Sequence, residues 1–81
     1  MNSKERSKLH KDLRKHWGSI TEVANRTGLT INMVIKVLKS ERNNDDVLQT
    51  ATSVLLEREI KRLNQRQIIE RNYKQALALA S

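Results

Sequence analysis

The sequence predicts an all-α fold: three short helices, at about residues 3–16, 20–26 and 31–40, then a long C-terminal helix from about residue 45. Three observations support this fold class. The 81 residues contain no proline and only two glycines, so few positions break a helix. Apolar residues recur at intervals of three and four, as they do on one face of a helix. Residues suited to helix caps stand at the expected boundaries.

The first expected helix carries a narrow apolar stripe. Leu9, Leu13 and Trp17 follow one another at intervals of four residues, which places them on one face of the helix. We expect all three side chains to enter the core, while basic residues occupy the other faces. Gly18 then ends this run.

The helix at 20–26 lies between a capping pattern and a glycine. Ser19 and Glu22 have the spacing of a capping box, in which the serine hydroxyl accepts from a helical amide and the glutamate reaches back. Gly28 ends the helix, because glycine adopts a left-handed backbone conformation at little cost. The expected inward side chains are Ile20, Val23 and Ala24.

The helix at 31–40 begins after Thr30, whose hydroxyl can cap its first turn. Its expected inward face consists of Val34, Val37 and Leu38. A polar connection without helical periodicity follows, so we expect this helix to end near residue 40.

The last helix starts after Asn44, a good N-cap, and two aspartates favour its positive N-terminal end. No breaker follows, and residues 45–80 as one continuous helix would span about 54 Å. That length exceeds the diameter expected of so small a domain. We therefore divide the chain into a helical domain at residues 1–56 and a C-terminal extension at residues 57–81, whose apolar residues need another surface to pack on.

The chain carries a net charge of +7, from 16 basic and 9 acidic side chains. The excess lies in the first half of the sequence. Residues 1–16 hold six basic and two acidic side chains, whereas residues 45–81 hold six basic and five acidic ones. Such a balance favours a polyanionic partner, with nucleic acid ahead of an anionic membrane surface.

Several classes of function lack their characteristic residues. The chain has no cysteine, which excludes a disulfide framework and a thiolate metal site, and two histidines on a lysine-rich segment do not suggest zinc. No glycine-rich phosphate loop or carboxylate cluster points to an enzyme, so we expect no catalytic residue, cofactor or metal. The sequence also lacks a membrane-spanning run and a signal peptide, which predicts a soluble cytoplasmic protein.

Residues 20–39 have the spacing of a helix-turn-helix motif. Ala24 is small enough for two helices to cross closely, Gly28 allows the turn, and Val34 fills the angle between the helices. Residues 19–56 resemble the DNA-binding headpiece of the lactose-repressor family. The matching segments are Glu22-Val23-Ala24, Gly28-Leu29-Thr30, Val34-Ile35-Lys36-Val37-Leu38 and residues 44–56. The basic helix before the motif is more similar to the Cro and phage-repressor class.

The resemblance implies a transcriptional regulator, a repressor, that binds double-stranded DNA in a bacterial cell or a phage-infected host. It implies that exposed residues of the helix at 31–40 contact base edges in the major groove: Thr30, Ile31, Asn32, Met33 and Lys36. It implies contacts with the DNA backbone from Ser19, Thr21, Lys39, Ser40, Arg42 and Asn43. We expect no inducer site or other small-molecule substrate, because the family's sugar-binding domain is absent from these 81 residues.

The chemistry of two of these side chains fits base recognition. Asn32 can bond bidentately to adenine, and Lys36 can donate to the acceptors of guanine. Ile35 departs from the family pattern, in which a small polar residue is commoner. Its side chain has three possible destinations: the core, the DNA or a partner protein.

The C-terminal extension offers a surface for oligomerisation. Its apolar residues at helical spacing are Leu56, Ile60, Leu63, Ile69, Tyr73 and Ala76. We expect a homodimer, because paired motifs on a two-fold axis are the usual way to read an inverted repeat. The polar run at residues 64–67 breaks the heptad spacing, which argues against a long regular coiled coil. The alternative is that the first three of these residues fold back on the domain and the later ones fray.

Two other classes of function remain open. A small helical module that binds a protein, for example a phage factor that inhibits a DNA-binding protein, is favoured by the apolar Ile31, Met33 and Ile35 on one helix. It predicts that binding depends on Ile35 and not on Asn32 or Lys36. A membrane-surface role for the basic first helix ranks third, because its few apolar residues are better used in the core.

Overall fold

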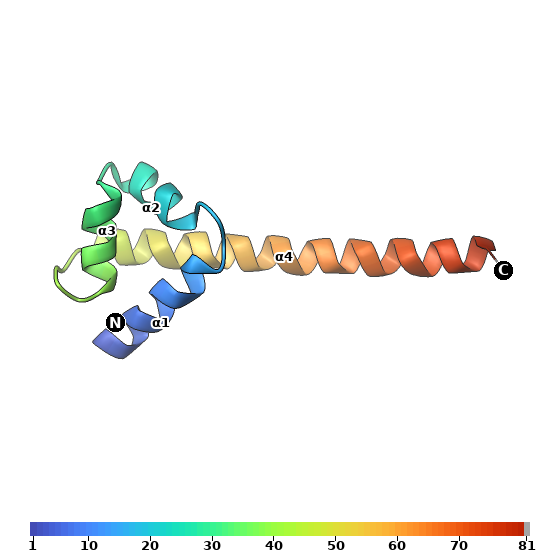
Figure 1. The fold of residues 1–81 in the computed structure, drawn as a ribbon, viewed down its shortest axis with the longest axis horizontal. Coiled ribbons are helices and arrows are strands. Elements are labelled where there is room, and N and C mark those ends of the chain that lie inside the picture. Colours follow the sequence, from blue (N-terminus) through green and yellow to red (C-terminus); the bar gives the residue numbers. More distant parts are fainter. Residues whose placement is uncertain (81) are drawn as a thin grey trace.

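A computed structural model describes residues 1–80, and within them it contains four helices and no strand. They are α1 (Ser3–Arg14), α2 (Ser19–Thr27), α3 (Ile31–Leu38) and α4 (Asp45–Ala80). The all-α class and the four predicted helices are therefore confirmed. The three short helices gather around the first part of α4, whose remainder projects away from them (Figure 1). We call residues 1–59 the head and residues 60–80 the tail.

The core of the head is formed by aliphatic side chains from all four helices. The buried apolar residues are Leu9, Leu13, Val23, Ala24, Val34, Val37, Leu38, Val47, Leu48, Ala51 and Val54. Ile20, Leu29 and Leu55 pack against this cluster from its edge. The inward faces predicted for α2 and α3 are thus correct, and burial of these side chains from water provides the main stabilisation of the head.

Helix α1 is shorter than predicted, and this corrects the prediction for Trp17. The helix starts with a capping box between Asn2 and Glu5 that the sequence analysis missed, and it ends at Arg14 rather than at residue 16. Because Trp17 follows the end of the helix, it no longer continues the stripe of Leu9 and Leu13. Its side chain is 94% exposed instead of packing in the core.

The predicted capping box of α2 is wrong. Ser19 is the first residue of the helix, and its N-cap is Gly18, which has a left-handed backbone conformation with φ +76°. The Ser19 hydroxyl donates to the carbonyl of Leu13 and is buried. A hydrogen-bond partner in the preceding helix has therefore taken the place of the helical amide that a capping serine would bind.

The turn between α2 and α3 has the predicted geometry. Gly28 ends α2 with φ +72°, and the Thr30 hydroxyl accepts from the amide of Met33 at 3.2 Å. Helix α3 ends at Leu38, two residues before the predicted boundary. Ser40 then adopts φ +65°, which lets the amide of Glu41 donate to the carbonyl of Lys36 at 2.9 Å. This pair of features is a helix-terminating motif usually built on glycine.

Helix α4 is one continuous helix of 36 residues. It starts at the predicted residue, and Asn44 caps it by accepting from the amide of Val47 at 3.3 Å. The radius of gyration is 17.1 Å, whereas a compact domain of this length has about 12 Å. The difference arises from the tail, because α4 runs without a break across the division predicted at residues 56 and 57.

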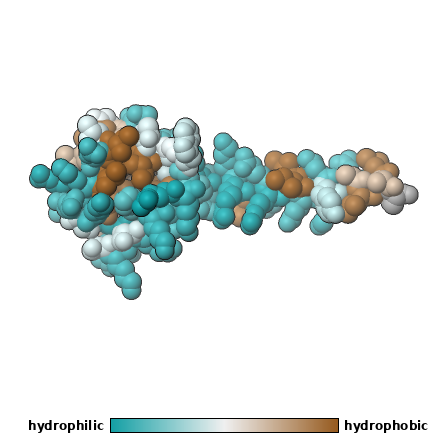
Figure 2. Space-filling view, viewed as in Figure 1, coloured by the Kyte–Doolittle hydropathy of each residue, from teal (hydrophilic) through white to brown (hydrophobic). Residues whose placement is uncertain are grey.

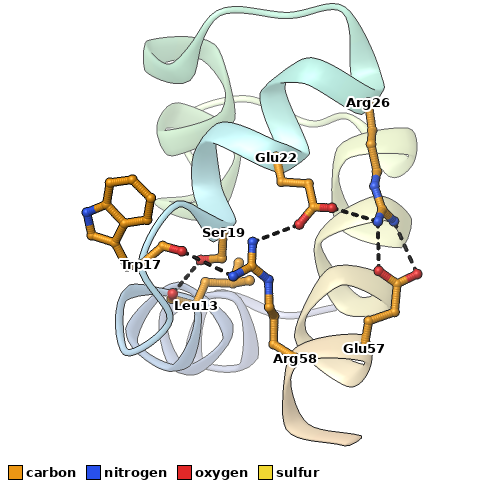
Figure 3. Close-up of polar contacts among 7 residues, drawn as sticks. All are labelled: Leu13, Trp17, Ser19, Glu22, Arg26, Glu57 and Arg58. Atoms are coloured by element: carbon orange, nitrogen blue, oxygen red, sulfur yellow. Dashed lines mark hydrogen bonds and ion pairs between the residues drawn. The ribbon is translucent and has the colours of Figure 1, made fainter. Parts of the chain in front are cut away.

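Ion pairs fasten α2 to α4 at the base of the head (Figure 3). The guanidinium of Arg58 donates to Glu22 at 3.0 Å and to the carbonyl of Trp17 at 3.2 Å. Arg26 donates to both carboxylate oxygens of Glu57, at 3.3 and 2.7 Å, and to Glu22 at 2.8 Å. The cluster links α2 to α4 at the surface, beside the core contacts that Val23 and Ala24 of α2 make.

Candidate nucleic-acid interface

Helix α3 presents one polar ridge on the side opposite its buried face. Asn32 and Lys36 are exposed and lie four residues apart, so they are neighbours on the helix surface. Val34, Val37 and Leu38 on the other side are completely buried. Because burial fixes the rotation of α3 about its axis, the ridge has a defined direction relative to the head.

The remaining residues predicted to contact bases lie beside this ridge. Ile31 is 44% exposed and Met33 is half-buried, and the two flank Asn32 on opposite sides because successive residues turn by about 100°. Thr30 is exposed at the start of the helix, where its hydroxyl accepts from a helical amide and still has a proton to donate. The structure therefore brings the predicted set together at one end of α3.

Four of the predicted backbone contacts gather where α3 ends. Lys39, Ser40, Arg42 and Asn43 are all exposed in the connection to α4. Arg6 of α1 holds this connection in place, because its guanidinium donates to the carbonyls of Val37 at 3.4 Å and Arg42 at 3.2 Å. Arg6 thus positions the loop, a role that the count of basic residues in the sequence could not indicate.

The two other predicted backbone contacts are separate from this group. Ser19 is only 1% exposed and its hydroxyl is bound to Leu13, so it cannot reach a phosphate and that prediction is wrong. Thr21 is exposed near the start of α2, where it lines an open hollow together with Trp17. The connection from α3 to α4 lies on the other side of the head (Figure 1).

Helix α1 adds basic residues to the interface that the sequence analysis did not include. An open hollow of about 440 Å³ is lined by Ser7, His10, Lys11, Arg14 and Lys15. A smaller one, of about 190 Å³, joins Ser7 and His10 to Lys39 at the end of α3. Residues 7, 10, 11 and 14 share one helical face, and this spacing was visible in the sequence.

Electrostatics distinguish this face from the other cations of α1. Lys8 and Lys15 both pair with Asp12, whereas among residues 1–80 neither Lys11 nor Arg14 takes part in an ion pair. Partial burial, followed by the nearby charges of Arg14 and Lys39, lowers the pKa of His10. Arg14 and Lys39 thus lie close enough to His10 to disfavour its protonation. The same positive charges make this surface attractive to anions.

The residues predicted for oligomerisation are exposed, but they do not form one surface. Leu56, Ile60 and Leu63 lie on the side of α4 that faces away from the core, whereas Ile69, Tyr73 and Ala76 lie roughly 140° around the helix, if the turn per residue is taken as 100°. Figure 2 shows apolar patches along the tail, separated by hydrophilic side chains. The alternative in which the first three residues fold back on the head is wrong, because all three are about half exposed or more.

No helix within residues 1–80 is long and apolar enough to cross a membrane. The same residues contain no group of three or more histidine, cysteine, aspartate or glutamate side chains that could hold a metal ion.

Comparison with known proteins gives no match for this chain. No protein-family model matches it, and neither the curated proteins nor the solved structures contain a match. The resemblance to helix-turn-helix regulators therefore depends on the sequence of residues 19–56 alone.

Proposed function

We propose that the protein is a transcriptional regulator that binds double-stranded DNA through α3, as a homodimer on an inverted repeat. One observation carries the proposal: the ridge of Asn32 and Lys36 is exposed on a helix whose opposite face is completely buried. A helix fixed in this way can enter the major groove with its polar side chains directed at base edges.

Each residue of the ridge has a defined role in this proposal. Asn32 bonds bidentately to an adenine, and Lys36 donates to the acceptors of a guanine. Each good pair of this kind contributes about 1–3 kcal/mol of discrimination against a wrong base. Ile31, which is partly exposed beside them, contacts a thymine methyl group.

The basic side chains around the ridge bind the phosphates. Lys39 and Arg42 follow α3, and Lys11 and Arg14 project from the adjacent face of α1. Contacts of this kind set the affinity and the register on the duplex, and they make binding depend on salt. A dimer held on its site in this manner acts as a repressor by excluding other proteins from the same DNA.

The proposal is tested by in-vitro selection of sites from a random duplex library, with the full chain at about physiological salt. We expect enrichment of an inverted repeat. The Lys36→Ala variant should lose preference at one position of each half-site, by a factor that corresponds to about 1–3 kcal/mol. The Lys39→Ala variant should bind all sequences more weakly and lower the salt slope by about 1. Lys61→Ala, at an exposed position of the tail, is the matched control.

The second candidate function is a protein-binding module, and the exposure of Ile31 on α3 favours it. Ile35 lies half-buried on the same helix. If the selection enriches no sequence and the duplex is retained only at low salt, the DNA proposal is wrong and this candidate takes its place. Binding to the protein partner should then depend on Ile35 and persist in the Asn32→Ala and Lys36→Ala variants.

A further inference from the structure

The tail of α4 lacks a covering surface. Every residue from 60 to 80 is exposed, including large apolar side chains such as Ile69 and Tyr73, the latter 64% exposed. An isolated helix of this length is marginally stable in water, because most helical stability in proteins comes from packing of an apolar face. A surface from another molecule is therefore needed to bury these side chains.

Two apolar stripes have to be covered, and they face different directions. The first stripe consists of Leu56, Ile60 and Leu63, and the second consists of Ile69, Tyr73, Ala76 and Leu77. With a turn of about 100° per residue, the centres of the two stripes lie roughly 120° apart around α4. One straight helix alongside α4 covers a single stripe, so the second stripe needs a different receptor.

The charge of α4 is unequally distributed along its length. Residues 45–59 contain four acidic side chains and one basic side chain, a net charge of −3, whereas residues 60–80 contain five basic and one acidic, a net charge of +4. Two copies side by side in parallel would place like charges together. Two antiparallel copies place the acidic half of each helix against the basic half of the other. The positive N-terminal end of each helix dipole then also lies near the negative C-terminal end of the other.

The head offers a receptor for the second stripe. An open hollow of about 470 Å³ lies between α1 and α4. Its apolar floor includes Met1, Leu9 and Leu55, and the charged side chains of Lys4, Glu5, Lys8 and Asp12 line it together with Thr52. Thr52 and Leu55 lie on α4 between its core-facing side and the first stripe, at about 100° per residue. A helix that packs on the first stripe therefore passes along the rim of this hollow.

We propose that a second copy of this chain is the occupant, packed antiparallel along α4. The first stripes of the two copies face each other, with Ile60 opposite Leu63 of the partner subunit. Glu59 then lies near Arg66 of the partner subunit, and the tail of each copy runs past Thr52 and Leu55 of the other. Each tail directs Tyr73 and Leu77 towards the hollow of the other copy. The interface is reciprocal, as two-fold symmetry requires.

This arrangement sets the distance between the two heads. In this register, residues 48–51 of the two copies, where α4 forms the core, lie roughly 32–41 Å apart along the helix pair. One turn of DNA separates half-sites by about 34–36 Å, so the dimer suits adjacent half-sites. This consequence alone rests on the proposed function; the dimer itself does not.

The dimer is tested first by sedimentation equilibrium of the full chain without DNA. We expect the wild-type chain to be dimeric at micromolar concentrations and the Ile60→Asp variant to associate at least tenfold more weakly. Lys61→Asp is the matched control, because Lys61 is exposed on another side of α4. Circular dichroism verifies that the heads stay folded. A monomeric wild-type chain, or an equal effect of the two substitutions, would overturn the proposal.

Orientation is tested by disulfide cross-linking, since the chain contains no cysteine. In the antiparallel register Gln49 lies opposite Lys74 of the partner subunit, and both are exposed on the side of α4 that carries the first stripe. A mixture of the Gln49→Cys and Lys74→Cys variants should therefore form the mixed disulfide, while neither variant alone should cross-link. Efficient cross-linking of Lys74→Cys to itself would indicate parallel helices and overturn the proposal.

Occupancy of the hollow is tested by a matched pair of substitutions in the tail. Leu77→Ser should weaken the dimer severalfold, whereas Leu79→Ser, at a more exposed position on a different face, should not. Equal effects would remove the hollow from the interface. All three measurements are made without DNA. A monomer therefore disproves the dimer and leaves DNA recognition by α3 standing, whereas a failed site selection by a proven dimer disproves the DNA function alone.

Discussion

At the scale of single residues, backbone conformation and local charge determine what the helix-turn-helix segment can do. Gly28 and Ser40 bound α3 on either side, and both have positive φ. For glycine this conformation is nearly free, but for serine it costs about 1 kcal/mol. The chain accepts this cost at Ser40, in the group of exposed residues predicted to contact phosphate.

Ser40→Gly should therefore raise the free energy of unfolding by about 1 kcal/mol, because the left-handed conformation is then unstrained. Urea denaturation followed by circular dichroism measures the change. The opposite substitution is Gly28→Ala, which should destabilise the fold by a similar amount. A methyl group at residue 28 meets no atom within 4 Å, so the cost there comes from the backbone alone. An unchanged midpoint for both variants would contradict this interpretation.

His10 provides a titratable probe of the basic face. Its pKa is lowered by partial burial and then by Arg14 and Lys39. In the Arg14→Ala variant the pKa of His10 should rise towards its ordinary value of about 6.5, as measured by NMR titration of the imidazole protons. Arg71→Ala, in the exposed tail, is the control and should leave the titration unchanged.

Binding of DNA should act on His10 in the same direction. Phosphates near the basic face favour the charged imidazolium, so they raise the pKa of His10, and affinity for a duplex should increase as the pH falls from 7 to 6. Calorimetry in buffers of different ionisation enthalpy should detect proton uptake on binding. Binding without proton uptake would separate His10 from the DNA interface.

At the scale of elements, ion pairs link α2 to α4. A hydrogen bond from Arg58, with a further one from Arg26, holds the pKa of Glu22 below its usual range. A hydrogen bond from His16 does the same for the pKa of Glu59. Both carboxylates bridge segments that are distant in sequence, so their ionisation is linked to the folding of the head.

The stability of the head should therefore decrease in acid. A carboxylate with a lowered folded-state pKa contributes stability that is complete above its unfolded value of about 4.3 and is lost as the pH falls through the folded value. Thermal unfolding between pH 5 and pH 3, followed by circular dichroism, measures this loss. Fluorescence is a poor probe here, because Trp17 is already exposed in the folded state.

Glu22→Gln isolates one contribution to this acid dependence. The variant should be less stable than the wild type at pH 6, and the difference should shrink as the pH falls through the lowered pKa of Glu22 and its carboxylate becomes protonated in the folded state as well. Glu70→Gln, on the exposed tail, is the control. A difference that stays constant with pH would show that the ionisation of Glu22 is not the cause.

At the scale of the whole molecule, the head and the tail have different sources of stability. The part of α4 in the head is buried in the core by residues such as Val47 and Val54, which are fully covered. The tail has no buried residue among its described positions. One continuous helix thus joins the packed head to a tail whose described residues are all exposed.

Hydrogen exchange should reveal this difference along α4. At concentrations where the chain is monomeric, amides of residues 60–80 should exchange much faster than those of residues 47–54, because the tail opens without disrupting the core. At concentrations where it is dimeric, protection should extend into the tail, and the Ile60→Asp variant should not show this gain. Uniform protection of α4 in the monomer would contradict it.

The sequence alone determined the fold class, the starts of α3 and α4, and the inward faces of α2 and α3. These features depend on local rules, such as the intolerance of helices for glycine, the caps supplied by Thr30 and Asn44, and the three- and four-residue spacing of core side chains. The caps are made by residues three positions apart, and the spacing of apolar residues indicates which side of a helix faces inward without indicating what that side contacts.

Only the tertiary structure decided the positions of Trp17 and Ser19, the structural role of Arg6 and the contribution of α1 to the basic face. Each depends on a contact with another element: the Ser19 hydroxyl bonds to the carbonyl of Leu13 in α1, and Arg6 reaches one carbonyl in the last turn of α3 and one in the connection that follows it. The two apolar faces of the tail have fixed directions relative to the head because α4 is one unbroken helix. The absence of a helix breaker in the sequence allowed this continuity, and the structure established it. Spacing places a residue on a helix face, but the packing of helices against one another determines what that face meets.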